Sequence, residues 1–191
     1  MTRPRTLHDT QLYRTAREVF LEQGPGAPVK EIARRLEVSQ AAVLQRAGTK
    51  TKLMLKALCP GTPPSLDVLF SPLAQDAQVI DVLAPLCHEL LDFITRSVPG
   101  LILARGANLP LDELAPTDPP PHLALRQVLG QWLHQAGVRG SWGKAEALVS
   151  AMEARALNLY LGGDAFVDKD AKAFITDLLN DVDFNTAGSL P

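Results

Sequence analysis

Apolar residues recur every three or four positions along most of the chain, a spacing that places them on one face of an α-helix. In the first third of the chain this pattern predicts four short helices, at residues 9–23, 29–36, 40–46 and 50–58. Farther along it predicts five more, at residues 76–98, 101–108, 123–135, 141–161 and 168–182. Because no strand-like alternation of apolar and polar residues is present, we expect an all-α fold of about nine helices.

The charges are divided unevenly at the end of the fourth predicted helix. The chain has a net charge of −2, but residues 1–58 hold 11 Lys/Arg against 5 Asp/Glu, and the remaining residues hold 8 against 16. A basic segment on an acidic chain favours a nucleic-acid partner, although solvated helix faces could give the same count. We therefore predict a DNA-binding domain over 1–48, a connecting helix over 49–58, and an antiparallel helical bundle over 59–191.

The segment from Val29 to Lys50 has the layout of a helix-turn-helix. The small residue Ala33 lies where two helices would cross, and the hydroxyl of Ser39 can cap an outward-facing second helix. Glutamine pairs with adenine, arginine with guanine, and an alanine methyl contacts thymine, while lysine and helix N-termini hold phosphates. The candidate DNA-binding residues are Lys30, Ser39, Gln40, Ala41, Gln45, Arg46, Thr49 and Lys50. The alternative is an ordinary two-helix corner with solvated side chains.

This part of the chain resembles the TetR family of repressors. The resemblance is carried by the runs Ala16 to Gly24 and Val29 to Ser39, by Thr49-Lys50, and by Leu53. It implies an N-terminal three-helix helix-turn-helix domain and a helical C-terminal domain. It also implies a homodimer that binds a palindromic operator in double-stranded DNA and is released when a small-molecule effector enters the C-terminal domain.

The chain departs from the family pattern at the corner and at the end of the recognition helix. The family usually has glycine at the corner, where this chain has Glu37, and a non-glycine residue at positive φ costs roughly 1 kcal/mol. Where the family usually has tyrosine, histidine and phenylalanine, this chain has Leu44, Arg46 and Ala47. A usual phosphate contact and an aromatic anchor are therefore missing, and Arg46 can replace the first of them.

Two features of residues 59–191 suggest a ligand pocket and a dimer interface. The helix predicted at 76–98 is apolar on more than one side and contains Pro85, which favours a kink and an apolar cavity beside it. The candidate pocket residues are Leu83, Cys87, Leu90, Phe93, Ile94, Arg105, Trp132, Met152 and Tyr160. Small and apolar stripes on the last two helices suggest dimer contacts at Ala151, Ala154, Phe174, Ile175 and Leu178. The alternatives are a solid core and stripes that pack on the chain itself.

Several classes of protein are disfavoured by what the sequence lacks. It has no P-loop, GxSxG or HExxH motif, and its only cysteines, Cys59 and Cys87, have no metal-binding spacing, so we expect no catalysis, metal or cofactor. No apolar run approaches the roughly 20 residues of a membrane span, so we expect no membrane contact. The basic N-terminus leads into an amphipathic helix and not into the apolar region of an export signal, so we expect a cytoplasmic protein. The alternative function is a helical ligand-binding or protein-interaction protein whose first domain no longer reads DNA.

Overall fold

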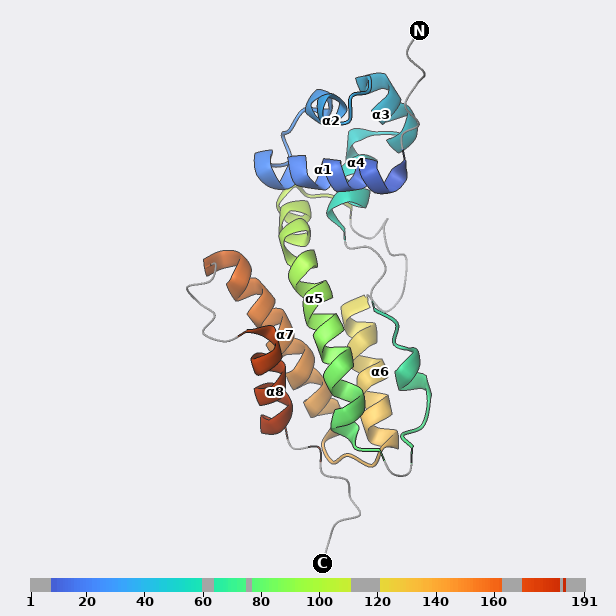
Figure 1. The fold of residues 1–191 in the computed structure, drawn as a ribbon, viewed down its shortest axis with the longest axis vertical. Helices are drawn as coiled ribbons and strands as arrows, with labels where there is room; N and C mark the ends of the chain where they lie inside the picture. The colour runs from blue at the N-terminus through green and yellow to red at the C-terminus, as the bar shows by residue number, and fades with distance from the viewer. Residues whose placement is uncertain are drawn as a thin grey trace, which may run out of the picture. The chain divides into compact units, whose positions relative to one another are not determined.

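The structure is a computed structural model that describes residues 8–59, 64–74, 77–110, 121–162, 170–182 and 184. These residues form helices and no strand, which confirms the predicted all-α class (Figure 1). The elements in chain order are α1 (Asp9–Gln23), α2 (Val29–Arg35), α3 (Gln40–Ala47), α4 (Lys50–Leu58), the short 3-10 helix η1 (Asp67–Phe70), α5 (Val79–Gly106), α6 (Pro121–Gln135), α7 (Ser141–Gly162) and α8 (Ala171–Asp181).

The prediction of two helices at 76–98 and 101–108 is wrong, because α5 is one helix of 28 residues that runs through Pro99 and Gly100. A proline in a helix removes one backbone donor and disfavours the turn before it, which is why the pattern predicts a break there. Packing on both sides of Pro99 outweighs this loss, since Ser97, Gly100 and Ala104 are all buried. The predicted kink at Pro85 stays a prediction.

The chain divides into two compact units. The head unit comprises Met1–Gly61 and Arg96–Pro116, and the body unit comprises Thr62–Thr95 and Thr117–Pro191. The prediction of a DNA-binding domain over 1–48, a connecting helix over 49–58 and a separate bundle over 59–191 is a division by function, and it stays a prediction.

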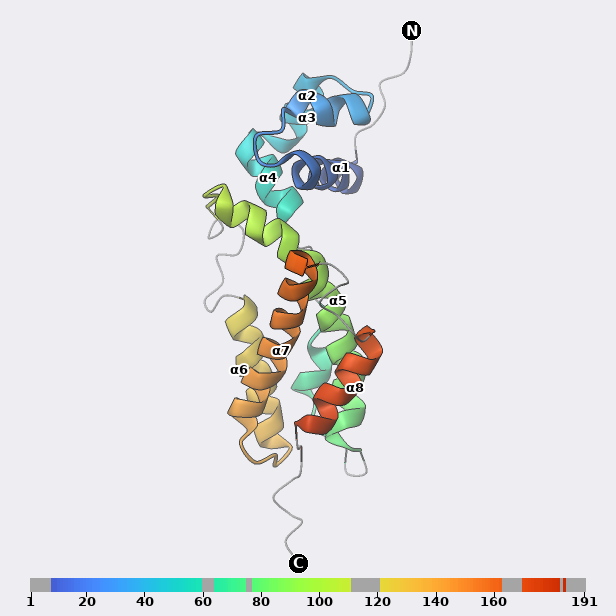
Figure 2. The same ribbon diagram turned by 90° about the vertical axis from the view of Figure 1, so that its left-hand side faces the viewer.

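The head unit is built on α1, which packs against α4 and α2 (Figure 2). Leu12, Ala16, Val19 and Phe20 recur at helical spacing on α1 and are fully buried. They share one apolar core with residues of the next three helices and of the end of α5, among them Ile32, Ala33, Val43, Leu53, Leu58 and Ala104.

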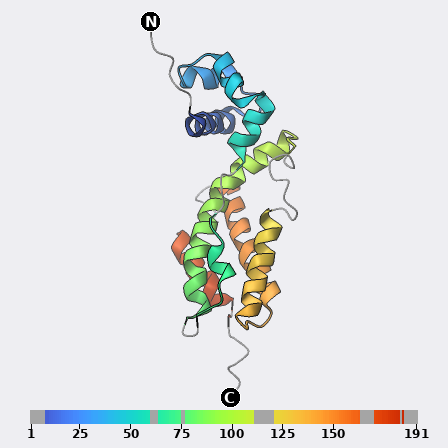
Figure 3. The ribbon, with the colours of Figure 1, turned by 90° about the vertical axis from the view of Figure 1, so that its right-hand side faces the viewer.

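In the body unit, α6 and α7 pack side by side (Figure 3), and α8 contacts α7. Their common core includes Leu83 and Leu90 from α5, Leu129 and Trp132 from α6, and Met152 from α7. The indole N–H of Trp132 donates a hydrogen bond to the Ser71 carbonyl at 3.1 Å, so the segment after η1 is tied to α6.

Candidate DNA-binding site

The corner between α2 and α3 has the backbone geometry that the sequence predicts. Glu37 has φ 55°, the left-handed conformation that glycine adopts without strain. Its N–H bonds the Arg34 carbonyl at 3.2 Å, and the Val38 N–H bonds the Ala33 carbonyl at 3.0 Å, a pairing that ends a helix sharply. The chain thus makes the tight corner of a helix-turn-helix with a glutamate in the glycine position.

Helix α3 is capped at its start and exposed along one side. The Ser39 hydroxyl oxygen accepts a hydrogen bond from the Ala42 N–H at 3.1 Å, as expected of an N-cap serine. Val43 and Ala47 face the core, and Ala47 is buried where the family pattern has an aromatic anchor. The four residues predicted to meet bases are exposed: Gln40, Ala41, Gln45 and Arg46.

The start of α4 is a second place suited to phosphate. The Thr49 hydroxyl oxygen accepts a hydrogen bond from the Lys52 N–H at 3.1 Å and fixes the first turn of the helix. The remaining N–H groups of that turn have no partner within the helix and carry its positive dipole end. Lys50 and Lys52 lie on this turn, and Lys30 lies on the first turn of α2.

Ion pairs use several of the head unit's arginines. Arg35 bonds both carboxylate oxygens of Glu22, at 2.5 and 3.1 Å, and it also bonds Glu31 at 3.1 Å. Hydrogen bonds from Arg34, and then from Arg35, lower the pKa of Glu31 to about 2. Lys30 and Lys50 form no ion pair within the part of the chain that the structure describes, so their charges are available to a polyanion.

Arg46 also has a partner, which the sequence did not indicate. Its Nε donates a hydrogen bond to Oδ1 of Asp9 at 2.6 Å, and this bond lowers the pKa of Asp9. The two residues are 37 positions apart, on α3 and α1. No local spacing rule predicts such a pair, because it depends on how α1 lies across the helix-turn-helix.

Arg17 ties three backbone segments of the head unit together. Its guanidinium donates to the carbonyls of Leu58 at 2.8 Å and Ala57 at 3.3 Å at the end of α4, and also to the carbonyl of Arg96 in α5. A Cβ atom added to Gly100 would lie 2.0 Å from the Leu58 carbonyl oxygen. Only glycine at position 100 permits this close approach of α5 to the end of α4.

Comparison with known proteins agrees with this geometry. Residues 12–57 match the sequence model of the bacterial regulatory proteins of the tetR family. Residues 12–57 therefore form a tetR-family domain. The match covers the helices that form the corner, its capped second helix and the start of α4, so the chain is a DNA-binding transcription regulator.

Two solved structures are similar to this chain. One, described as the molecular basis for control of antibiotic production by a bacterial hormone, has a related fold and is 18% identical, with a TM-score of 0.52 over 90% of this chain and 91% of that one. The other is a candidate transcription regulator from Lactobacillus plantarum, 12% identical, with a TM-score of 0.46 over 91% of this chain and 97% of that one. No curated protein sequence matches this chain.

Most of the predicted pocket residues of this regulator lie in the core of the body unit. Leu83, Cys87, Leu90, Trp132 and Met152 are buried together, and Ile94 packs against them. Phe93 is half-buried and Tyr160 is 44% exposed. Arg105, proposed for an acidic effector, is exposed and belongs to the head unit.

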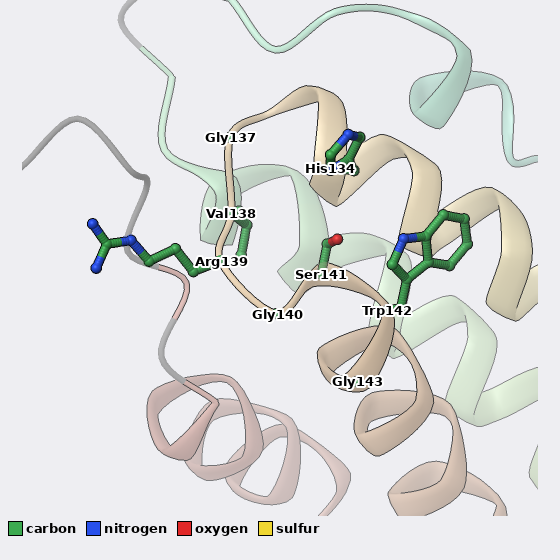
Figure 4. A pocket seen from close by; sticks show the side chains of 8 residues that line it. All are labelled: His134, Gly137, Val138, Arg139, Gly140, Ser141, Trp142 and Gly143. Atoms are coloured by element: carbon green, nitrogen blue, oxygen red, sulfur yellow. The ribbon is translucent and has the colours of Figure 1, made fainter.

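A hollow lies at the turn between α6 and α7 (Figure 4). It has a volume of about 440 Å³ and is lined by His134, Gly137, Val138, Arg139, Gly140, Ser141, Trp142 and Gly143. Trp142 is 56% exposed, and its ring rests on Gly130, where an added Cβ would lie 2.4 Å from the ring. None of these residues was among the predicted pocket residues.

The predicted dimer residues have different surroundings in the single chain. Ala154 is exposed and Ala151 is half-buried on α7. On α8, Ile175 is only 1% exposed, while Phe174 and Leu178 are half-buried against the same core. Ala154 belongs to a stripe of exposed small and apolar residues along one side of α7, which also contains Ala147, Leu157 and Leu161.

The described cysteines and acidic residues show no sign of a metal site. Among the described residues, no group of three or more His, Cys, Asp or Glu could hold a metal ion. Burial raises the pKa of the Cys87 thiol to about 12, which keeps it protonated and unreactive. No described helix is long and apolar enough to cross a membrane.

Proposed function

We propose that this regulator is a cytoplasmic, non-enzymatic repressor that binds a palindromic operator as a homodimer and leaves it when a small-molecule effector binds the body unit. The observation that carries the proposal is the exposed side of α3 beside two side-chain-capped helix starts. Ser39 caps α3 and Thr49 caps α4, so both helices begin with ordered backbone donors.

Each exposed group has a role in this proposal. Gln45 pairs with an adenine edge, Arg46 with guanine or a phosphate, and the methyl of Ala41 contacts thymine in the major groove. Lys30, Lys50 and the first turn of α4 hold phosphates and so set the position of α3 in the groove. Gln40 and the Ser39-capped start of α3 lie at the end of the helix that enters the groove first.

The proposed dimer interface uses α7 together with α8. Leu157 and Leu161 are 41% and 70% exposed in the single chain, and Ala147 and Ala154 leave room for another helix beside them. Large exposed apolar side chains next to small ones on one helix side favour helix–helix association. The half-buried Phe174 and Leu178 of α8 would lie at the edge of this contact.

The proposed effector site lies in the body unit between α5, α6 and α7, where the predicted residues Leu83, Cys87, Trp132 and Met152 gather. These residues are closely packed, so an effector would have to displace core side chains or enlarge a space between them. A ligand can shift the equilibrium between two conformations only as far as its affinities for them differ. The effector is therefore expected to favour a rearranged body that holds DNA poorly.

DNA binding is tested by fluorescence anisotropy with DNA from upstream of the gene and with random duplexes at physiological salt. The wild type should prefer its operator by several orders of magnitude, as specific regulators do. Gln45→Ala should weaken the operator complex by about 1 to 3 kcal/mol and relax the preference at one base pair. Lys50→Ala should weaken binding to all duplexes alike and reduce the slope of log K against log salt by about 0.9.

The matched control is Lys172→Ala, which removes the same charge from an exposed position on α8. It should leave affinity, preference and salt slope unchanged. If the wild type binds operator and random duplexes equally, and Gln45→Ala changes no preference, the repressor proposal fails. The alternative function, a ligand-binding protein whose first domain no longer recognises DNA, would then be favoured.

The dimer is tested by sedimentation at micromolar concentration with the variant Ala154→Glu. Because Ala154 is exposed in the single chain, the glutamate should leave the fold intact and separate the protomers. Gln131→Glu adds the same charge at an exposed position on α6 and should leave the dimer intact. A wild type that sediments as a monomer would refute the interface.

The effector is tested by screening small molecules for release of labelled operator from the dimer. A true effector should raise the melting temperature of the free protein, since it binds the folded state. Met152→Ala, which alters the core of the body unit, should change the affinity for the effector without changing the operator sequence preferred. A compound that releases DNA without stabilising the free protein acts elsewhere.

A further inference from the structure

The pair formed by Asp9 and Arg46 joins the start of α1 to the end of the proposed recognition helix. We propose that Asp9 is a positioning residue for DNA recognition, whose carboxylate holds the Arg46 side chain in the orientation that reads the operator. This inference rests on the proposed function, because it assumes that α3 enters the major groove.

The bond leaves the reading edge of the guanidinium open. Asp9 accepts the Nε–H of Arg46 at 2.6 Å, and within the described ranges no other hydrogen bond is made by this guanidinium. The two Nη groups are the donors with which arginine makes bidentate contacts to guanine or phosphate. A carboxylate on the Nε side therefore sets the plane of the guanidinium without occupying those donors.

The pair is too exposed to matter much for folding. The side chains of Arg46 and Asp9 are 54% and 53% exposed, and ion pairs in such surroundings add little to the stability of a fold. Its effect should appear on DNA instead, where the groove excludes water and strengthens the attraction between the two charges. A side chain that is already oriented also loses less conformational entropy on binding.

The carboxylate has a cost that makes the proposal testable. A negative charge at this position repels the DNA backbone whatever the base sequence, although Arg46 and the nearby Lys56 partly offset it. Removal of the carboxylate should therefore strengthen binding to random DNA while it weakens preference for the operator. A residue that only stabilised the fold would not produce these opposite changes.

The experiment measures operator and random-duplex affinity by anisotropy over a salt series for the full-length wild type, Asp9→Ala, Asp9→Asn, Arg46→Ala and the double variant Asp9→Ala/Arg46→Ala. Asp9→Ala should bind random duplexes roughly two- to threefold more tightly, because one repulsive charge is gone. Its ratio of operator to random affinity should fall roughly fivefold or more, as expected when a base-reading arginine is no longer held. Asp9→Asn keeps an oxygen acceptor for Nε but lacks the negative charge. It should therefore restore part of the ratio of operator to random affinity, while random duplexes stay as tightly bound as in Asp9→Ala.

The double variant and a second acidic residue complete the test. In the Arg46→Ala background, Asp9→Ala should no longer lower the ratio, since no side chain remains to be positioned. Glu18→Ala removes a carboxylate from an exposed position on the same helix and should leave the ratio unchanged. Circular dichroism melting of each variant shows whether the fold is intact.

The possible failures are distinguishable. If Asp9→Ala strengthens operator and random binding by the same factor, the carboxylate only repels DNA and the inference is overturned. The inference also fails if Arg46→Ala leaves the ratio unchanged while Gln45→Ala lowers it, because Arg46 then reads nothing. A wild type without any operator preference overturns the proposed function itself.

Discussion

The head and body units use arginine in contrasting ways. In the head unit, Arg46 is half exposed and pairs with an equally exposed Asp9. In the body unit, Arg126 is 15% exposed and bonds Glu153 at 2.7 Å and Glu146 at 2.9 Å, which joins α6 to α7. The guanidinium is thus open to solvent in one unit and mostly buried between two helices in the other.

The difference indicates what each unit is built to do. An exposed ion pair contributes little to folding, so the head unit can use Arg46 for DNA recognition at small cost to its own stability. The Arg126 guanidinium is mostly buried although its partners Glu146 and Glu153 are 60% and 41% exposed, so removal of the arginine should cost more than the loss of a fully exposed pair.

The close approach of α5 to α4 should make Gly100 the most sensitive small residue of the head unit. Gly100→Ala would place a Cβ 2.0 Å from the Leu58 carbonyl oxygen and disturb the carbonyls that Arg17 binds. Overpacking against backbone is expected to lower the free energy of unfolding by roughly 2 to 3 kcal/mol, measured by urea denaturation. Gly106→Ala in the same helix meets nothing within 4 Å and should not destabilise the protein.

Arg126 in the body unit should contribute more to the free energy of unfolding than Arg35 in the head unit. Arg126→Met removes the link between α6 and α7 and leaves two carboxylates without their partner, so we expect a loss of roughly 1 to 2 kcal/mol in urea denaturation. Arg35→Met breaks the pairs with Glu22 and Glu31, and it should cost less because the Arg35 side chain is 27% exposed and that of Arg126 only 15%. An equal or larger loss for Arg35→Met would contradict the contrast between the units.

Glycine in place of Glu37 at the corner of the helix-turn-helix should increase the stability of the protein. Glu37→Gly relieves a left-handed conformation at φ 55°, so we expect the free energy of unfolding to rise by up to about 1 kcal/mol. Glu37→Ala keeps the strain and should show no such gain. Operator preference should stay unchanged in both variants, since neither adds a base contact.

The smallest expected effect is the pH dependence of the Glu31 ion pairs. The folded state holds the pKa of Glu31 at about 2, below its ordinary value of 4.5. Their stabilisation is therefore complete above pH 4.5 and is lost as the pH falls towards 2. Urea denaturation over this range should show a flatter pH dependence for Glu31→Gln than for the wild type.

Much of the head unit was determined by the sequence alone, because its signals are local. The helix spacing of Leu12, Ala16 and Phe20, the hydroxyl caps at Ser39 and Thr49, and the left-handed Glu37 all depend on neighbours within a few residues. The outward side of α3 followed from the same short-range periodicity, since the inward Val43 leaves only one side for Gln45. Capping and periodicity act within a turn or two, so they can be recognised without knowledge of the fold.

Features that depend on residues far apart in the sequence could be decided only by the tertiary structure. Helix α5 continues through Pro99 because packing against the end of α4 outweighs a lost hydrogen bond, and no local rule contains that packing. Ile175 faces its own core although its stripe could equally have faced another chain. Asp9 finds Arg46 across 37 residues because α1 and α3 are brought together by a shared apolar core. An apolar pattern shows which side of a helix is buried, and only the assembled fold supplies the partner that buries it.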